Sequence, residues 1–109
     1  VDCGTLINPN IATAQVEGAI AFGLTAALKG AITIENGRVE QSNFVDYPQL
    51  RMDEMPEVSA FFIDSDEPPG GIGEIAVPPV APAVANALVR ATGKRYRKLP
   101  LRLERRPTE

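Results

Sequence analysis

Apolar residues recur at helical spacing along residues 11–28, and this is the strongest periodic pattern in the chain. One side of such a helix carries Val16, Ile20, Leu24 and Leu28. The opposite side is also small and apolar, and a helix that is apolar nearly all round is normally buried on most sides. We therefore expect this helix to pack between other elements, with Asn10 or Thr13 as its N-cap.

Two glycines interrupt this predicted helix. Gly18 and Gly23 each weaken an isolated helix by about 1 kcal/mol relative to alanine. Their presence indicates close packing against another backbone or a bulky ligand. Gln15 lies on the same helix, and a buried amide there would have to hydrogen-bond either to a neighbouring main chain or to a bound cofactor.

A second helix is predicted over residues 80–91, because prolines suit its first turn and Thr92-Gly93 ends it. Asn36-Gly37 lies between two short apolar runs and predicts a β-hairpin. Residues 1–6, 57–63 and 96–101 predict three further strands. The order strand, helix, hairpin, strand, helix, strand indicates an α/β (α+β) fold, with two main helices on a mixed sheet.

Residues 42–55 show no regular pattern and predict a long loop. In a small domain such a loop is usually functional or covered by a partner. We assign Asp46, Tyr47 and Arg51 a structural role in this loop, without a catalytic function.

The composition of the chain argues against several classes of function. A net charge of −3 over 109 residues argues against nucleic-acid binding. With one cysteine and no histidine, the chain offers no plausible ligand set for a zinc ion or for an iron–sulfur cluster of its own. The compartment, cytoplasm or periplasm, is left open. The most apolar run, residues 18–28, is too short to span a bilayer, so no membrane span is expected. The chain starts at Val1, as a processed product or a fragment would.

A glycine-rich loop precedes the second helix, with Gly70, Gly71 and Gly73 just before Glu74. A single carboxylate on such a backbone is a candidate general base, and a solvated loop residue near a helix N-terminus is the alternative. A phosphate site is a poor fit, because the loop lacks the lysine and hydroxyl residue of a P-loop and Glu74 would repel an anion.

Three segments in order carry a family resemblance: Asp2-Cys3-Gly4 through Ile7-Asn8-Pro9 with Gln15-Val16-Glu17-Gly18-Ala19, then Ser42-Asn43-Phe44 with Asp46-Tyr47-Pro48, then Gly70-Gly71-Ile72-Gly73-Glu74 with the proline-rich helix start. Together they resemble the C-terminal portion of the molybdenum-binding subunit of the xanthine dehydrogenase/aldehyde oxidase family. The isoquinoline 1-oxidoreductase β-subunit and aldehyde dehydrogenase branch is the most similar.

The resemblance implies that residues 1–101 are a fragment of a larger molybdopterin-binding domain, followed by a polar tail at residues 102–109. It implies that Glu74 is the general base in a hydroxylation of an aldehyde or an N-heteroaromatic ring, with water as the oxygen source. Gln15, Gly71 and Gly73 would contact the molybdenum–molybdopterin cofactor, and the protein would supply no metal ligand. Iron–sulfur clusters on a partner subunit or domain would take up the electrons, and this piece alone would be inert.

The alternative is an autonomous α/β module that binds a partner or has a structural role, without a cofactor. A complete module should cover the small-residue face around Gly18 and Phe22, whereas a fragment should expose it.

Overall fold

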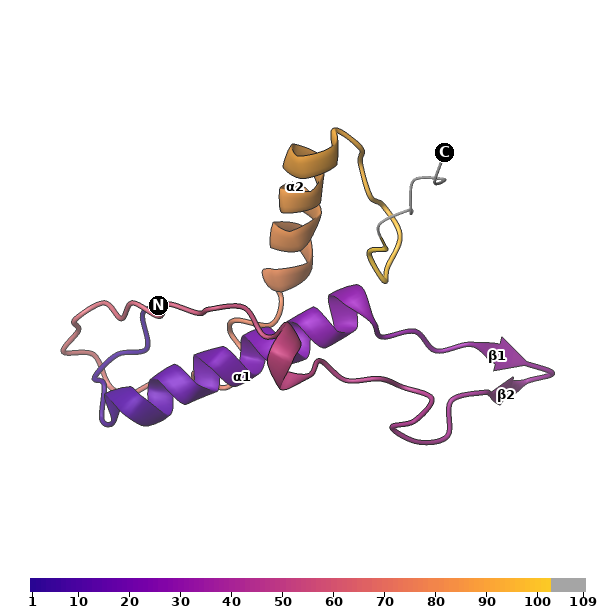
Figure 1. Ribbon diagram of the computed structural model, residues 1–109. Helices are drawn as coiled ribbons and strands as arrows, with labels where there is room; N and C mark the ends of the chain where they lie inside the picture. The colour runs from indigo at the N-terminus through magenta and orange to yellow at the C-terminus, as the bar shows by residue number, and fades with distance from the viewer. Residues whose placement is uncertain (103–109) are drawn as a thin grey trace.

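One long helix, α1 (Pro9–Leu28), is the axis around which the other segments are arranged (Figure 1). The computed structural model describes residues 1–102. Its radius of gyration is 17.3 Å, against about 13 Å for a compact domain of 100 residues. The chain is therefore extended around α1, and much of its apolar surface stays open.

α1 begins at a proline. Asn8 is its N-cap, and its side-chain oxygen accepts a hydrogen bond from the Ile11 N–H at 3.1 Å. The prediction that Asn10 or Thr13 caps the helix is wrong, because Pro9 suits the first helical position and places the start two residues earlier. Seven residues of α1 are buried: Ala12, Val16, Ala19, Gly23, Leu24, Thr25 and Ala27.

The 20-residue α1 is long and apolar enough, by length and composition, to cross a membrane. The sequence-based reasoning that the apolar run is too short overlooked the turns that α1 gains before residue 18. Length and composition alone do not distinguish such a span from the core helix of a soluble protein, and the absence of a membrane span stays a prediction.

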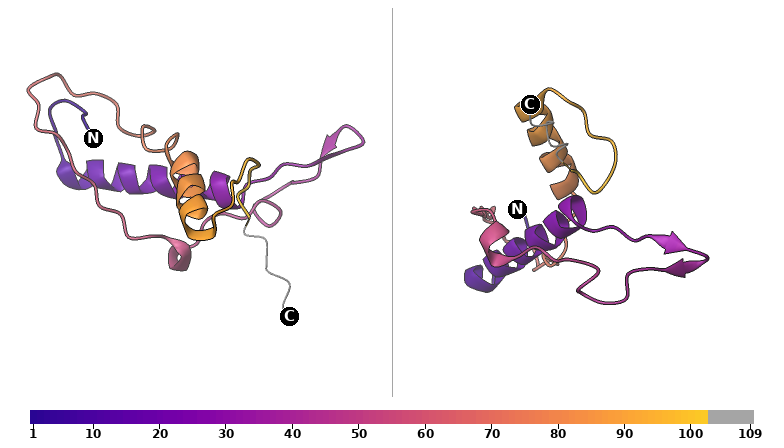
Figure 2. Two further views of the ribbon diagram at one scale, coloured as in Figure 1. Left: turned by 90° about the horizontal axis from the view of Figure 1, so that it is seen from above. Right: turned by 45° about the vertical axis from the view of Figure 1, so that its right-hand side comes forward.

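The second helix, α2 (Val80–Thr92), starts against α1 and rises away from it (Figure 1; Figure 2 gives two further views). Gly93 ends it in the left-handed conformation, with φ of 72°. This is the predicted helix with its predicted glycine stop. An apolar cavity lies in the angle between the two helices, with Val16, Ile20 and Leu24 of α1 on one side and Val80, Ala83 and Val84 of α2 on the other.

The hairpin forms as predicted. β1 (Ile34–Glu35) pairs with β2 (Arg38–Val39) in antiparallel register, Ile34 opposite Val39. Asn36 and Gly37 both have positive φ, 49° and 77°, which is the requirement of a type I′ turn. The hairpin projects beyond the C-terminal end of α1 and is exposed (Figures 1 and 2).

Two helices with a small two-stranded sheet confirm the mixed α/β class. The three further strands, at residues 1–6, 57–63 and 96–101, are wrong, since the hairpin is the only sheet within residues 1–102. The first two segments lie side by side: the Ile63 N–H donates to the Val1 carbonyl, and the Thr5 N–H to the Glu67 carbonyl, both at 2.8 Å. The third meets the end of α1 through one bond, from the Leu101 N–H to the Ala27 carbonyl at 2.7 Å.

These segments are extended but lack the continuous run of partners that a ladder requires. The irregular stretch between the hairpin and residue 57 contains one short 3₁₀ helix, η1 (Met52–Glu54). The predicted polar tail, residues 102–109, lies outside the described residues except for Arg102.

Candidate functional site

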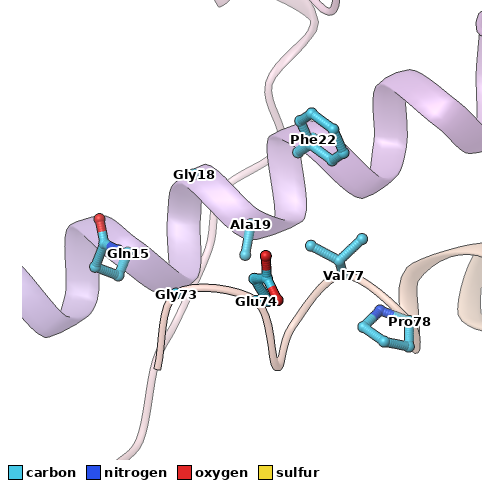
Figure 3. Close-up of a pocket in the computed structure, with 8 residues that line it drawn as sticks. All are labelled: Gln15, Gly18, Ala19, Phe22, Gly73, Glu74, Val77 and Pro78. Atoms are coloured by element: carbon cyan, nitrogen blue, oxygen red, sulfur yellow. The ribbon is translucent and has the colours of Figure 1, made fainter. Parts of the chain in front are cut away.

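A cavity of about 470 Å³ lies between α1 and the loop that leads into α2 (Figure 3). Two segments far apart in the sequence form its walls. Its lining consists of Gln15, Gly18, Ala19, Phe22, Gly73, Glu74, Val77 and Pro78.

α1 supplies one wall through residues three and four positions apart. Gln15, Gly18, Ala19 and Phe22 recur at the spacing that places side chains on one helix face. Gly18 leaves this wall open: outside its own helix backbone and chain neighbours, none of the described residues has a heavy atom within 4 Å of where its Cβ would stand. Phe22 is 67% exposed, so the cavity has an apolar rim that the described residues do not cover.

The opposite wall is a tight turn. The Val77 N–H donates to the Glu74 carbonyl at 2.9 Å, and the Val80 N–H donates to the Val77 carbonyl at 3.2 Å, which leads directly into α2. Glu74 is exposed, and in Figure 3 its carboxylate lies between Ala19 and Val77. Within residues 1–102 this carboxylate has no hydrogen-bond or ion-pair partner, so both of its oxygens are available to a ligand.

The glycine loop lies beside Gln15 in the cavity (Figure 3). A Cβ on Gly73 would stand 3.3 Å from the Nε2 atom of Gln15, which is tighter than an ordinary van der Waals contact. Glycine at this position therefore lets the loop backbone lie against the amide. Gln15 is exposed, so the alternative of an ordinary buried amide does not hold within the described residues.

The start of the glycine loop is held by the N-terminal segment. The Gly70 N–H donates to the Cys3 carbonyl at 2.8 Å. Gly4 has φ of 68°, and a Cβ there would stand 2.2 Å from the Pro68 carbonyl oxygen. Glycine is required at this position for both reasons, so Gly4 lets the N-terminal segment lie against the residues just before the glycine loop.

Three of the four predicted site residues come together: Gln15, Gly73 and Glu74 all line the cavity. Gly71 is exposed and is not among the lining residues. Sequence reasoning missed Val77 and Pro78 as part of the lining. The sequence already singles out the face around Gly18 and Phe22, and the helical spacing from Gln15 could have added Ala19, which follows it by four positions.

Among the described residues, Glu54, which pairs with Lys29 at the C-terminal end of α1, has a pKa that departs from its ordinary value. Lys29 donates to the Glu54 carboxylate and to the Gln49 carbonyl, and Glu54 also accepts from the Arg51 N–H at 2.8 Å. The hydrogen bond from Lys29, followed by that from the Arg51 backbone, lowers the pKa of Glu54 below its ordinary value of 4.5. This pair fastens η1 to the end of α1 and lies outside the cavity lining.

No group of three or more acidic, cysteine or histidine side chains within residues 1–102 could hold a metal ion. What the cavity offers instead is one amide, one carboxylate and two glycines beside an apolar rim. Such a set suits a polar ring system held through hydrogen bonds, with a proton acceptor next to it.

Comparison with known proteins shows which family this chain is similar to. The model of the molybdopterin cofactor-binding domain family matches residues 1–56. The isoquinoline 1-oxidoreductase subunit beta of Brevundimonas diminuta is 38% identical over 102 residues, which are 94% of this chain and 13% of that protein. A membrane-bound aldehyde dehydrogenase of Gluconacetobacter polyoxogenes is 40% identical over 102 residues, again 94% of this chain and 13% of the relative.

The fold is similar to part of a solved structure, the copper- and molybdenum-containing CO dehydrogenase. The TM-score is 0.73 at 28% identity, covering 84% of this chain and 12% of the other. The resemblance predicted from the three sequence segments is thus confirmed. The chain spans about an eighth of the length of the proteins that it matches.

Proposed function

This chain belongs to the molybdopterin cofactor-binding domain family, and on that premise we propose that it forms one wall of the active site of a molybdenum hydroxylase. In this proposal residues 1–101 are the C-terminal part of a longer molybdopterin-binding subunit. The complete enzyme oxidises an aldehyde or an N-heteroaromatic compound, with water as the source of oxygen. The observation that carries the proposal is the Glu74 carboxylate, which has no hydrogen-bond or ion-pair partner within residues 1–102 and lies in the same cavity as Gln15.

The residues present fit the molybdopterin cofactor. Gln15 offers two N–H donors and one acceptor, which suit the polar edge of a pterin. Gly73 lets the loop backbone lie against Gln15, and Gly18 leaves the cavity wall open beside them. Gln15 and the backbone at Gly73 would therefore hold the cofactor, while the role of Gly71 would depend on residues beyond this cavity. When bound, the cofactor would supply the two-electron acceptor for the oxidation.

Glu74 acts as the general base in this proposal. One of its carboxylate oxygens accepts a proton from the nucleophile as that nucleophile adds to the substrate carbon. The turn from Glu74 to Val77 fixes the backbone that carries the carboxylate. A general base of this kind contributes about 10²–10⁴-fold to the rate.

The apolar side of the cavity suits the proposed substrates. Phe22, Val77 and Pro78 line the same space as Glu74. A planar aromatic ring or the carbon chain of an aldehyde would contact these side chains, and their presence would keep bulk water from the reacting carbon.

Exposed apolar side chains support a fragment over an autonomous module. Phe22 is 67% exposed, Phe44 75% and Phe61 80%. Apolar surface of this kind is rarely left open in a complete soluble protein. We propose that the rest of the subunit covers it, that iron–sulfur clusters on a partner subunit or domain receive the electrons, and that the isolated piece is inert.

The direct test is Glu74→Gln in the full-length natural protein. We expect turnover to fall by at least about 10²-fold, because the amide cannot accept the proton, while the molybdenum content per subunit stays unchanged. Glu57→Gln is the matched control, since it removes the same charge at an exposed position outside the cavity lining. A Glu74→Gln enzyme that keeps near-normal turnover would contradict the assignment.

A further inference from the structure

The start of α2 lies closely against α1 at Gly23, which is buried. A Cβ built on Gly23 would stand 2.8 Å from Cγ2 and 2.9 Å from Cβ of Val80, and 3.1 Å from the carbonyl oxygen of Val77. Real Cβ atoms essentially never approach other atoms this closely, so any side chain here forces a shift. Gly23 therefore sets how closely the turn before α2 lies on α1.

The displaced atoms belong to the turn that presents Glu74. The Val77 carbonyl that faces Gly23 also accepts the Val80 N–H, and the Val77 N–H donates to the carbonyl of Glu74. Val77 and Glu74 line the same cavity. A displacement of Val77 and Val80 would therefore be transmitted to Glu74 through these two backbone hydrogen bonds.

We propose that Gly23 is a positioning residue for Glu74: the missing Cβ fixes the separation between α1 and the 74–80 turn, and with it the place of the carboxylate in the cavity. The inference rests on the proposed role of Glu74 as general base. Gly23 itself is not among the residues that line the cavity.

The expected effect follows from the geometry of proton transfer. A general base acts within hydrogen-bond reach of the proton that it accepts. A displacement of about 1 Å can cost about 10²-fold in rate even when the mutated residue is far from the chemistry. An added methyl group at Gly23 should therefore lower the rate of the chemical step more than it weakens substrate binding.

The experiment uses Gly23→Ala in the full-length, molybdenum-loaded enzyme, with kcat expressed per bound molybdenum. We expect kcat to fall by about 10- to 10²-fold, with KM rising by a smaller factor: Gly23 does not line the cavity, and the displaced Val77 contributes only part of its apolar side. The double variant Gly23→Ala/Val80→Ala should recover part of the loss. It removes Cγ2, the nearest atom, but keeps the Val80 Cβ at 2.9 Å.

Ala27→Gly is the control for general weakening of α1. Ala27 is 1% exposed on the same helix, and glycine there weakens the helix without pressing on Val77 or Val80. A similar loss of kcat in Ala27→Gly would overturn the inference. So would a Gly23→Ala enzyme with normal kcat, or a double variant that recovers nothing.

The result for Glu74→Gln separates this inference from the proposed function. Loss of turnover in Glu74→Gln with a normal kcat in Gly23→Ala would refute the positioning role and leave the function standing. Normal turnover in Glu74→Gln would refute both. If Gly23→Ala does not accumulate as loaded enzyme, Val80→Ala tests the same contact: it should lower kcat per molybdenum severalfold, and an unchanged kcat would overturn the proposal.

Discussion

Gly18 and Gly23 lie five residues apart on α1, in opposite surroundings. A Cβ at Gly23 would collide with Val80, whereas one at Gly18 would meet nothing within 4 Å among the described residues outside its own helix backbone and chain neighbours. The same residue type therefore serves two purposes on one helix. Gly23 permits close packing between parts of this chain, and Gly18 opens onto the cavity.

The contrast extends to the two regions around these glycines. The C-terminal third of α1 and its C-cap residue, Lys29, are bound to several segments: Thr25 to Leu50, Ala27 to Leu101 and Lys29 to Glu54. The face from Gln15 to Phe22 meets the glycine loop across an open cavity. The chain's own contacts thus hold the C-terminal end of α1 in place. The face from Gln15 to Phe22 is left free for the cofactor that we propose.

Thr25→Val tests the C-terminal end of α1. It should change amide exchange more than the Gly18→Ala variant described below. The Thr25 hydroxyl donates to the Ala21 carbonyl at 2.9 Å and accepts from the Leu50 N–H at 3.0 Å. Valine keeps the shape but removes the acceptor, which leaves a partly buried N–H unpaired at a cost of about 1–3 kcal/mol. Amide exchange in residues 45–55 of the full-length protein, measured by mass spectrometry, should become about tenfold faster or more.

Thr13→Val is the control for that measurement. Thr13 makes the same kind of bond, from its hydroxyl to the Pro9 carbonyl at 2.9 Å, but it is not the residue that accepts the Leu50 N–H. Exchange in residues 45–55 should not change in this variant. Equal acceleration in both variants would show that the contrast between the two regions is mistaken.

Gly18→Ala tests the open face, with a smaller effect of the opposite sign. Alanine is favoured over glycine in a helix interior by about 0.5–1 kcal/mol, and no described contact opposes the new methyl group. In the cofactor-free protein the amides of α1 should therefore exchange about two- to fivefold more slowly. Faster exchange would mean that residues outside this chain already fill the space beside Gly18.

Local signals in the sequence were enough to predict the helices and the hairpin. Asn36-Gly37 occupies the two positive-φ positions of a tight turn, and Gly93 stops α2 in the left-handed conformation. The pairing of Gln15 with Gly73 and Glu74 came from the family resemblance, because nothing local to either segment indicates that they lie together.

The extra strands could not be predicted correctly because a strand depends on its neighbours. Residues 57–63 have β-forming composition, but they meet the chain's first residues through isolated hydrogen bonds. The N-cap is misplaced because the apolar periodicity begins only at residue 11, whereas α1 begins at Pro9. The family resemblance implies a cofactor contact for both Gly71 and Gly73, yet of these two only Gly73 lines the cavity.

The most direct test of the central claim is the molybdenum content of the natural protein, measured by elemental mass spectrometry together with its intact mass. The account predicts close to one molybdenum per subunit, in a chain much longer than 109 residues. A metal-free natural protein of this length would contradict it, because the cavity between Gln15 and Glu74 would then hold no such cofactor.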